Sequence, residues 1–339
     1  MKPHVLFITE KWCDCKPEMG LTNSFHNLFG SLEAAGLASY SNIFFDEWSI
    51  ENAVRCDEEV LKQGMKADLV VVTPLNGIPH APHVQTLGKI RDAGIPVVAI
   101  HFDSVSPKNL AYADTMLPQI SFNVVLDSGI SYLDSIHSNR YVPLWTPQDP
   151  RIFNNPNKIR DIPISHLGTT RGRPERENCL NFVGSRGIKV YSRGGQRQDN
   201  LPIEEYADVL QRSLITLNWC ENSKFKQLKG RIFEAMLCGA CLFESENEEI
   251  GRYFVAGEDY VPFKGQNSES LSHMLRGYTE EKDGIKEAIR IAANGHKKAT
   301  ELYNASNFWK TVFDKAGING HRHIDTDSKK ASVKTPLAN

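Results

Sequence analysis

The chain has 339 residues, enough for about two domains of ordinary size. With 39 Lys and Arg against 41 Asp and Glu, its formal net charge of -2 excludes the overall basic character of a nucleic-acid or anionic-membrane binder. A hydrophobic content of 40% with 24% charged residues excludes wholesale disorder. No apolar run is long enough for a membrane span or a signal-peptide core, and seven scattered cysteines favour a reducing compartment. We therefore expect a cytoplasmic protein with no membrane span.

The first part of the chain alternates short apolar runs with stretches of helical spacing. The apolar runs predict strands at residues 4–9, 43–45, 68–73, 96–101 and 120–126. Apolar residues at helical spacing predict helices at residues 21–35, 50–63 and 83–93. Strands that alternate with helices in this way form right-handed βαβ units around a parallel sheet.

A proline-rich stretch interrupts this alternation. Pro143, Pro147 and Pro150 stand close together and are followed by a polar, Asn-rich segment, 154–157. The pattern then restarts, with strands predicted at 162–167, 188–191, 214–217, 240–243 and 260–263, and helices at 174–185, 202–211, 228–237, 268–276, 284–293 and 297–315. The sequence thus predicts an α/β protein with two Rossmann-like halves joined near Pro143–Pro150.

Ligands of open parallel sheets bind beyond the carboxyl ends of the strands, so charged residues just after the predicted strands are candidates for a binding site. After the predicted strand ending at Leu167, Gly168 opens a turn into a helix, and Arg171, Arg173 and Arg176 add positive charge. Residues 151–200 hold ten basic and four acidic residues, a net charge of +6. A helix N-terminus with cations nearby is typical of a phosphate site, and a solvated basic face is the alternative.

A second group of cations precedes the predicted helix 228–237. Lys224, Lys226, Lys229 and Arg231 come just before Glu234, an isolated carboxylate in an otherwise apolar helix. The cations could hold a diphosphate at the helix N-terminus, and the carboxylate could accept hydrogen bonds from a ribose diol. The alternative is a salt-bridged helix start.

These residues resemble a known family. The segments 229–240 and 257–263, with Lys229-Gly230-Arg231 and Phe233-Glu234 in the first, are similar to the C-terminal half of GT-B glycosyltransferases. Within these they are most similar to the glycosyl-transferase-one-like group that includes spore-maturation proteins. The resemblance extends from Val142 to about Phe313 and is only architectural before that.

The resemblance implies a GT-B architecture, in which two Rossmann-like parallel-sheet domains face an interdomain cleft. It implies an N-terminal acceptor domain at 1–145, a C-terminal nucleotide-sugar donor domain at 146–305, and a final helix at 306–319 that crosses back to the first domain. Residues 320–339 show no apolar periodicity and predict a disordered tail.

The family also implies an activity: transfer of a sugar from a nucleotide-diphosphate sugar (UDP-, GDP-, ADP- or dTDP-linked) to an acceptor hydroxyl. Glu234 matches the carboxylate that binds the donor ribose, and Lys229 and Arg171 match positions that neutralise the diphosphate leaving group. Fixed cations can replace a divalent metal there, so no cofactor besides the donor is expected. The acceptor is left open among a glycan, a protein, a small molecule and modified DNA.

Further residues are expected to complete the donor site: Gly168, Arg176, Asn218 and Arg231. The chain departs from the family at one position. Many retaining members place a second glutamate eight residues before the ribose-binding one, where this chain has Lys226. Retention of the sugar's anomeric configuration is therefore not implied.

An inverting reaction needs a base in the first half to deprotonate the acceptor hydroxyl. Asp103, just after the predicted strand ending at His101, is the first candidate, although it could equally be a turn carboxylate. Asp127 is the second candidate, and Asp14 and His26 near the first loop follow. Gly20 could let the donor phosphates or the acceptor approach the backbone.

One other sequence feature and two alternative functions complete the picture. Cys238 and Cys241 have the spacing of a metal pair, but they straddle a predicted helix end and strand, so we expect no metal site. The alternatives to a transferase are a nucleotide-sugar epimerase or hydrolase on the same fold, and a non-catalytic nucleotide-sugar-binding protein.

Overall fold

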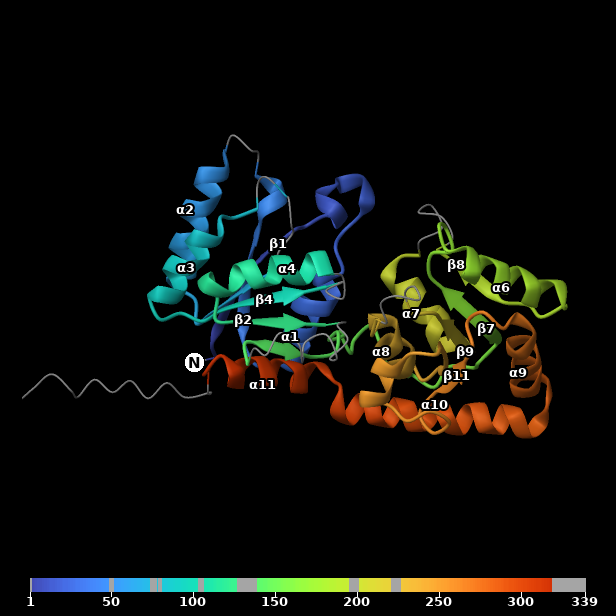
Figure 1. Cartoon of the computed structure of the whole chain (residues 1–339). Coiled ribbons are helices and arrows are strands. Elements are labelled where there is room, and N and C mark those ends of the chain that lie inside the picture. Colours follow the sequence, from blue (N-terminus) through green and yellow to red (C-terminus); the bar gives the residue numbers. More distant parts are fainter. Residues whose placement is uncertain are drawn as a thin grey trace, which may run out of the picture.

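The structure is a computed structural model that describes residues 2–48, 52–73, 78, 81–102, 107–126, 139–194, 201–220 and 227–318. It contains two parallel sheets, one in each half of the chain (Figure 1). The α/β fold class with two parallel-sheet halves predicted from the sequence is confirmed. The predicted tail at 320–339 lies outside the described residues.

The first sheet has six strands in the order β2-β1-β3-β4-β5-β6, all parallel. The strands are β1 (His4–Thr9), β2 (Ser39–Phe44), β3 (Leu69–Val72), β4 (Val97–His101), β5 (Phe122–Val125) and β6 (Tyr141–Pro143). Its helices are α1 (Ser31–Ala35), α2 (Ala53–Gly64), α3 (Val84–Asp92) and α4 (Pro107–Met116). A π-helical segment, Phe25–Gly30, leads directly into α1.

The strands of the first sheet are buried because apolar side chains leave both faces. On β1, Val5 and Phe7 join one hydrophobic cluster with Leu28 and Leu32, whereas Leu6 and Ile8 join another with side chains of α2 and α3. Successive side chains of a strand point to opposite faces, so an unbroken apolar run fits a sheet with helices on both sides.

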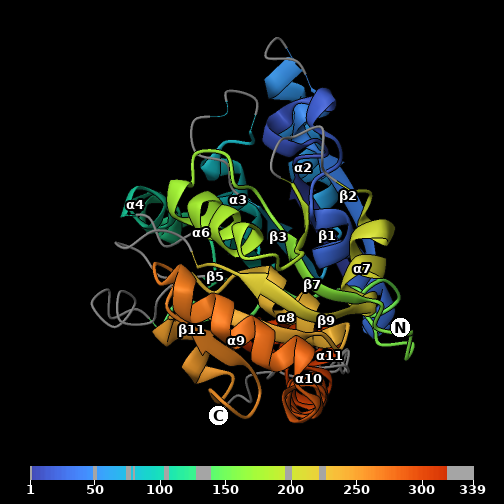
Figure 2. The same ribbon diagram turned by 90° about the vertical axis from the view of Figure 1, so that its right-hand side faces the viewer.

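The second sheet has five parallel strands in the order β11-β10-β9-β7-β8. The strands are β7 (Ile162–Leu167), β8 (Tyr191–Arg193), β9 (Ser213–Asn218), β10 (Cys241–Ser245) and β11 (Val261–Phe263). The helices are α6 (Pro174–Ser185), α7 (Ile203–Arg212), α8 (Gly230–Leu237), α9 (Ser268–Glu280), α10 (Lys282–Leu302) and α11 (Ala305–Lys315). Figure 2, viewed from the second half, shows α6 and α9 side by side on this sheet.

Several predicted elements differ from the structure at their limits. The strand predicted at 188–191 is observed at Tyr191–Arg193, because Ile188 packs into the core before the strand pairs with β7. The helices predicted at 284–293 and 297–315 are instead α10, continuous to Leu302, and α11. Strand β6 and helix α4 were not predicted.

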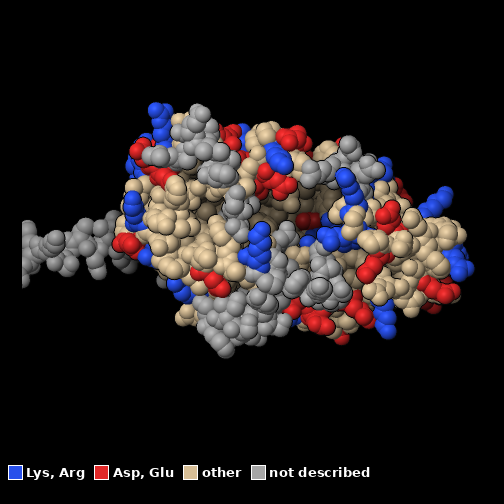
Figure 3. Space-filling model, turned by 45° about the horizontal axis from the view of Figure 1, so that its top comes forward, with Lys and Arg blue, Asp and Glu red and all other residues tan. Residues whose placement is uncertain are grey.

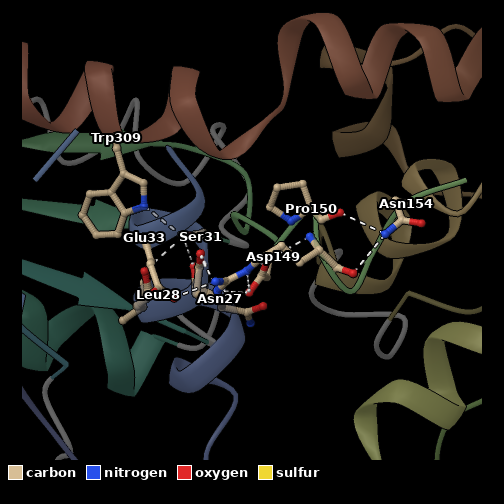
Figure 4. A network of polar contacts seen from close by, with 10 residues as sticks. Asn27, Leu28, Ser31, Glu33, Asp149, Pro150, Asn154 and Trp309 are labelled. Atoms are coloured by element: carbon tan, nitrogen blue, oxygen red, sulfur yellow. Dashed lines mark hydrogen bonds and ion pairs between the residues drawn. The ribbon is translucent and has the colours of Figure 1, made fainter. Parts of the chain in front are cut away.

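The last helix, α11, packs against α1 of the first half (Figure 1). The indole Nε1 of Trp309 donates a 2.8 Å hydrogen bond to Oγ of Ser31, which itself donates to the carbonyl of Asn27 at 2.6 Å (Figure 4). Trp145 lies in the segment of the chain that connects β6 to β7. Its ring packs edge-on against that of Phe308, with 6.0 Å between the ring centroids. One hydrophobic cluster therefore contains side chains of both halves.

Asp149, at the junction between the halves, lies against the π-helical segment of the first half (Figure 4). Its carboxylate accepts hydrogen bonds from Arg151, whose guanidinium also pairs with Glu33 of α1 at 2.7 Å. A Cβ at Gly30 would lie 2.3 Å from Oδ2 of Asp149, so only glycine lets the π-helical segment approach this carboxylate. The junction thus fixes the π-helical segment and α1 against the start of the second half.

Candidate active site

Described residues of both halves line two cavities between them, and Figure 3 shows the hollow from outside. The α4-side cavity has a volume of about 600 Å³ and is lined by Lys108, Asn109 and Tyr112 of α4, by the end of β1 and by the start of α8. The α7-side cavity has a volume of about 640 Å³ and is lined by the first loop (residues 10–24, after β1), by the start of the π-helical segment, by Gly168 and by Tyr206 of α7. Arg231 and Glu234 line both cavities, so the two meet at α8.

Helix α8 presents its N-terminus to this cleft. Lys229 is the N-cap residue with an extended backbone, and the helix begins at Gly230. The residues facing the core, Ile232, Phe233 and Met236, are buried, which turns Arg231 and Glu234 toward the cleft. An amphipathic helix start thus places a cation and a carboxylate beside the backbone N–H groups of the first helical turn.

Glu234 is held by two neighbours. The hydroxyl of Tyr206 donates to its Oε2 at 2.6 Å, and Nε2 of Gln148 donates to its Oε1 at 3.4 Å. Burial raises the pKa of Glu234, and the Tyr206 hydrogen bond and the Arg231 charge oppose that rise. Tyr206 and Gln148 were not predicted as site residues.

Arg231 is held from two sides. Its Nε donates to the Tyr206 hydroxyl at 3.3 Å, and its Nη1 donates to Oδ1 of Asn218 at 3.1 Å. A Cβ at Gly168 would lie 2.7 Å from that Nη1, so the glycine leaves room for the guanidinium. The structure therefore brings Gly168, Asn218, Arg231 and Glu234 together.

Behind Asn218 lies a fully buried carboxyl group. Nδ2 of Asn218 donates to Oε2 of Glu244 on β10 at 2.6 Å, and Oε1 of Glu244 is buried with no hydrogen-bond partner among the described residues. Burial raises the pKa of Glu244 to about 8, so the group holds its proton at neutral pH. The hydrogen bond orients the Asn218 amide so that its oxygen faces Arg231.

Two predicted phosphate ligands lie elsewhere. Arg176 is buried, and its guanidinium donates to the carbonyl oxygens of Thr169 at 2.5 Å and Trp219 at 3.4 Å. Arg171 is exposed in the turn before α6 and lines neither of the two cavities. Their roles in donor binding stay predictions, whereas Lys229 lines the α4-side cavity.

The first loop supplies the opposite wall. Gly20, with φ of 81°, and His26 line the α7-side cavity, and Asp14 lines the α4-side cavity. Burial lowers the pKa of His26 to about 4, so its ring is neutral at physiological pH. Glu10, not predicted as a site residue, also lines the α4-side cavity.

His101 ends β4 in the wall of the α4-side cavity. Its Nε2 lies 2.7 Å from Oδ1 of Asn123, and Nδ2 of Asn123 donates to the carbonyl of Ala113 at 3.2 Å. Because that amide orientation makes Asn123 the acceptor, Nε2 of His101 carries the proton and Nδ1 is left as an acceptor. Burial lowers the pKa of His101 to about 4.

The first two candidates for the base, Asp103 and Asp127, lie outside the described residues. Within the described part of the chain, no three His, Cys, Asp or Glu side chains lie close enough together to hold a metal ion. No helix there has the length and apolar character needed to cross a bilayer.

Solved structures with the same architecture cover nearly the whole chain. HepE from Anabaena, in complex with UDP and glucose, superposes with a TM-score of 0.62 at 12% identity, over 93% of this chain and 99% of that one. Sucrose-phosphate synthase from Thermosynechococcus elongatus gives 0.59 at 11% identity, over 93% and 99%. An alpha1,3-fucosyltransferase gives 0.52 at 13% identity, over 92% and 91%. Two parallel sheets facing a shared cleft therefore define a GT-B fold, as predicted.

The second half also matches a sequence family. Residues 172–314 match the family model described as Glycosyl transferase-like, so the chain carries a glycosyltransferase-family domain. This match includes α8 with Arg231 and Glu234. The resemblance to GT-B glycosyltransferases is confirmed, and the narrower placement beside spore-maturation proteins stays a prediction. A comparison with curated proteins finds no match.

Proposed function

We propose that this protein moves a sugar from a nucleotide-diphosphate sugar, bound at the start of α8, to an acceptor hydroxyl in the α4-side cavity. The observation that carries the proposal is the meeting of two cavities at Arg231 and Glu234. One cavity can hold each substrate, and the reacting atoms would meet between them. Domains at 1–145 and 146–305, with 306–319 returning to the first, fit this division of labour.

The donor contacts follow from the chemistry of α8. Glu234 keeps one oxygen on Tyr206 and can accept a ribose hydroxyl with the other, because Gln148 contacts that oxygen only at 3.4 Å. Lys229, Arg231 and the backbone N–H groups at the helix start can stabilise the diphosphate as it leaves. This arrangement supports a metal-independent reaction. UDP is the first nucleotide to test, because HepE was solved with UDP and with glucose.

The acceptor pocket is polar. Thr22, Ser24, Asn27, Thr73 and Tyr112 line the α4-side cavity with hydroxyl and amide groups. Such a wall suits a hydroxyl-rich acceptor, because each buried polar group needs a hydrogen-bond partner when water leaves. A glycan or a small polyol is therefore the first acceptor class to test.

Thermal unfolding in the presence of nucleotides tests the proposal. UDP, GDP, ADP, dTDP and UDP-glucose are each added at rising concentration to the wild type, to Glu234→Ala and to Glu205→Gln as control, since Glu205 is exposed on α7. A ligand at 100 times its Kd adds about 2.7 kcal/mol to the unfolding free energy. We expect one nucleotide to stabilise the wild type and the control but not Glu234→Ala. Failure of all nucleotides and nucleotide sugars to stabilise the wild type would contradict the proposal.

Addition of EDTA tests metal independence. Because cationic side chains and a helix N-terminus supply the positive charge, UDP affinity and sugar transfer should be the same with and without the chelator. Loss of transfer that added Mg²⁺ or Mn²⁺ restores would show that the reaction needs a metal.

A further inference from the structure

Glu10 is a carboxylate in the wall of the α4-side cavity, on the side of the first sheet. It is the first residue after β1, at the carboxyl edge of the first sheet, and it lines the α4-side cavity. Lys229, Arg231 and Glu234 line the same cavity from the second half. Glu10 therefore lies in the acceptor wall, across the cavity from the proposed donor site.

No cation neutralises Glu10 in the described part of the chain. The adjacent Lys11 pairs instead with Glu47, at 2.5 Å. Cys15 contacts the Glu10 carboxylate through its thiol, whose Sγ lies 3.8 Å from Oε2, and through a backbone hydrogen bond. A carboxylate without an ion pair keeps its basicity for another proton donor.

The surroundings of Glu10 raise the pKa of its carboxyl group toward neutral pH. Burial raises its pKa to about 7, and the nearby carboxylates Asp46 and Asp14 add to the rise, while hydrogen bonds from Cys15 oppose it. Asp46 is fixed there because the backbone N–H groups of Lys11 and Trp12 donate to it at 2.8 and 2.9 Å. The other titratable groups lining the cavity are Cys13, Asp14, His101, Lys108, Tyr112, Lys229, Arg231 and Glu234.

We propose that Glu10 is the base that accepts the proton of the acceptor hydroxyl. This inference rests on the proposed function. The acceptor O–H bond breaks, its proton passes to the Glu10 carboxylate, and the oxygen forms a bond to the anomeric carbon. The bond from that carbon to the diphosphate oxygen breaks, and its electron pair leaves on the diphosphate. A single displacement of this kind inverts the anomeric configuration.

Among the described residues, Glu10 is better suited to act as the base than Asp14 or His26. Asp14 is exposed, and burial holds the pKa of His26 near 4, below that of an effective base at neutral pH. Glu10 combines a half-buried position in the cavity wall with a pKa of about 7. General bases work best when their pKa lies near the operating pH.

The variants Glu10→Gln and Glu18→Gln form a matched pair. Glu18 is exposed in the same loop, lines neither cavity and carries the same charge. Each is assayed with UDP-glucose, and with the other nucleotide sugars if that one does not bind, against water and a panel of glycerol, glucose and methyl glucosides. We expect Glu10→Gln to lower kcat by about 100-fold or more while the Kd for UDP stays within about threefold. Glu18→Gln should match the wild type in both.

The pH profile gives a second readout. The wild-type kcat should rise tenfold per pH unit up to a midpoint near 7 and then level off. That limb should be absent from the residual rate of Glu10→Gln. The transferred sugar, followed by NMR, should have the anomeric configuration opposite to that of the donor.

Different failures separate the two proposals. A wild type that binds no nucleotide sugar overturns the proposed function and this inference with it. Donor binding with wild-type turnover in Glu10→Gln, or a product of retained configuration, overturns only the inference. If donor binds but no acceptor reacts, ¹³C NMR of the carboxyl resonance lost in Glu10→Gln decides: a midpoint near 7 supports the inference, and one near 4.5 overturns it.

Discussion

The hydroxyl of Tyr206 donates a 2.6 Å hydrogen bond to Oε2 of Glu234, and so joins α7 to α8 at the edge of both cavities. The same hydroxyl accepts from Nε of Arg231 at 3.3 Å. One phenol therefore orients both the carboxylate and the guanidinium of the proposed donor site.

Tyr206→Phe should weaken nucleotide binding. Without the hydroxyl, Glu234 loses its strongest orienting bond, and its pKa rises further because that bond lowers it. A hydrogen bond to a charged group contributes about 1.5–3 kcal/mol, so the Kd for UDP should rise about tenfold or more. Calorimetric titration of the wild type and the variant with UDP measures this change in Kd. Tyr303→Phe is the control, because the Tyr303 hydroxyl donates to the carbonyl of Tyr253 and lines neither cavity. Equal affinities in both variants would contradict the role of Tyr206.

Gly168→Ala should disturb the site without unfolding it. The added Cβ would lie 2.7 Å from Nη1 and 3.0 Å from Cζ of Arg231, so the flexible side chain would move away from Asn218. Loss of that position should raise the Kd for UDP about fivefold, or about 1 kcal/mol. Gly184→Ala on α6 is the control, since its Cβ would meet no atom of the described residues within 4 Å and alanine favours the helix. Unchanged affinity in Gly168→Ala would show that Arg231 does not bind the donor.

Glu244→Gln should change how stability depends on pH. The folded state keeps the Glu244 proton up to a pKa of about 8, whereas the unfolded chain releases it near 4.5. The unfolding free energy of the wild type therefore falls as pH rises from 4.5 to 8, by about 5 kcal/mol at most from this group. The glutamine has no proton to release, so the variant should gain stability over the wild type across that range. Urea unfolding at pH 5, 6.5 and 8 measures the difference, and parallel profiles would contradict the prediction.

Ser31→Ala should weaken the junction between the halves. The change leaves the indole N–H of Trp309, which is fully buried, without its partner. An unpaired buried donor costs about 1–3 kcal/mol, to be measured by urea unfolding. Ser185→Ala, at the exposed end of α6, is the control because it makes the same change in helix propensity. Its free energy of unfolding should stay within about 0.5 kcal/mol of that of the wild type. A loss no larger in Ser31→Ala than in this control would show that the contact adds nothing.

Most of the fold follows from apolar runs in the sequence. Val70 and Val71 are fully buried on opposite faces of β3, and such runs have few alternatives to a parallel strand. Helix α4 was missed because it starts at a proline and has no clear apolar stripe, although Leu110 and Ala113 are buried. Strand β6 was missed because it is only three residues long and ends at a proline of the junction.

The site was predictable only in part. Charge patterning pointed to α8, where Lys229, Arg231 and Glu234 do line the cleft. It could not show which way a long side chain turns, and Arg176 turns inward to two carbonyl groups. Glu10 was missed because its significance depends on burial and on a wall formed by residues more than two hundred positions later in the chain.

The hydrophobic cluster that runs through the junction ties the two halves together thermodynamically. Phe7 of the first sheet packs against Trp309, and Trp145 packs against both Tyr303 and Phe308. Separation of the halves would expose apolar surface on each, so neither can unfold without cost to the other. A nucleotide that touches only the second half would then protect the first sheet as well, and hydrogen exchange in β1 and β3 would slow on binding.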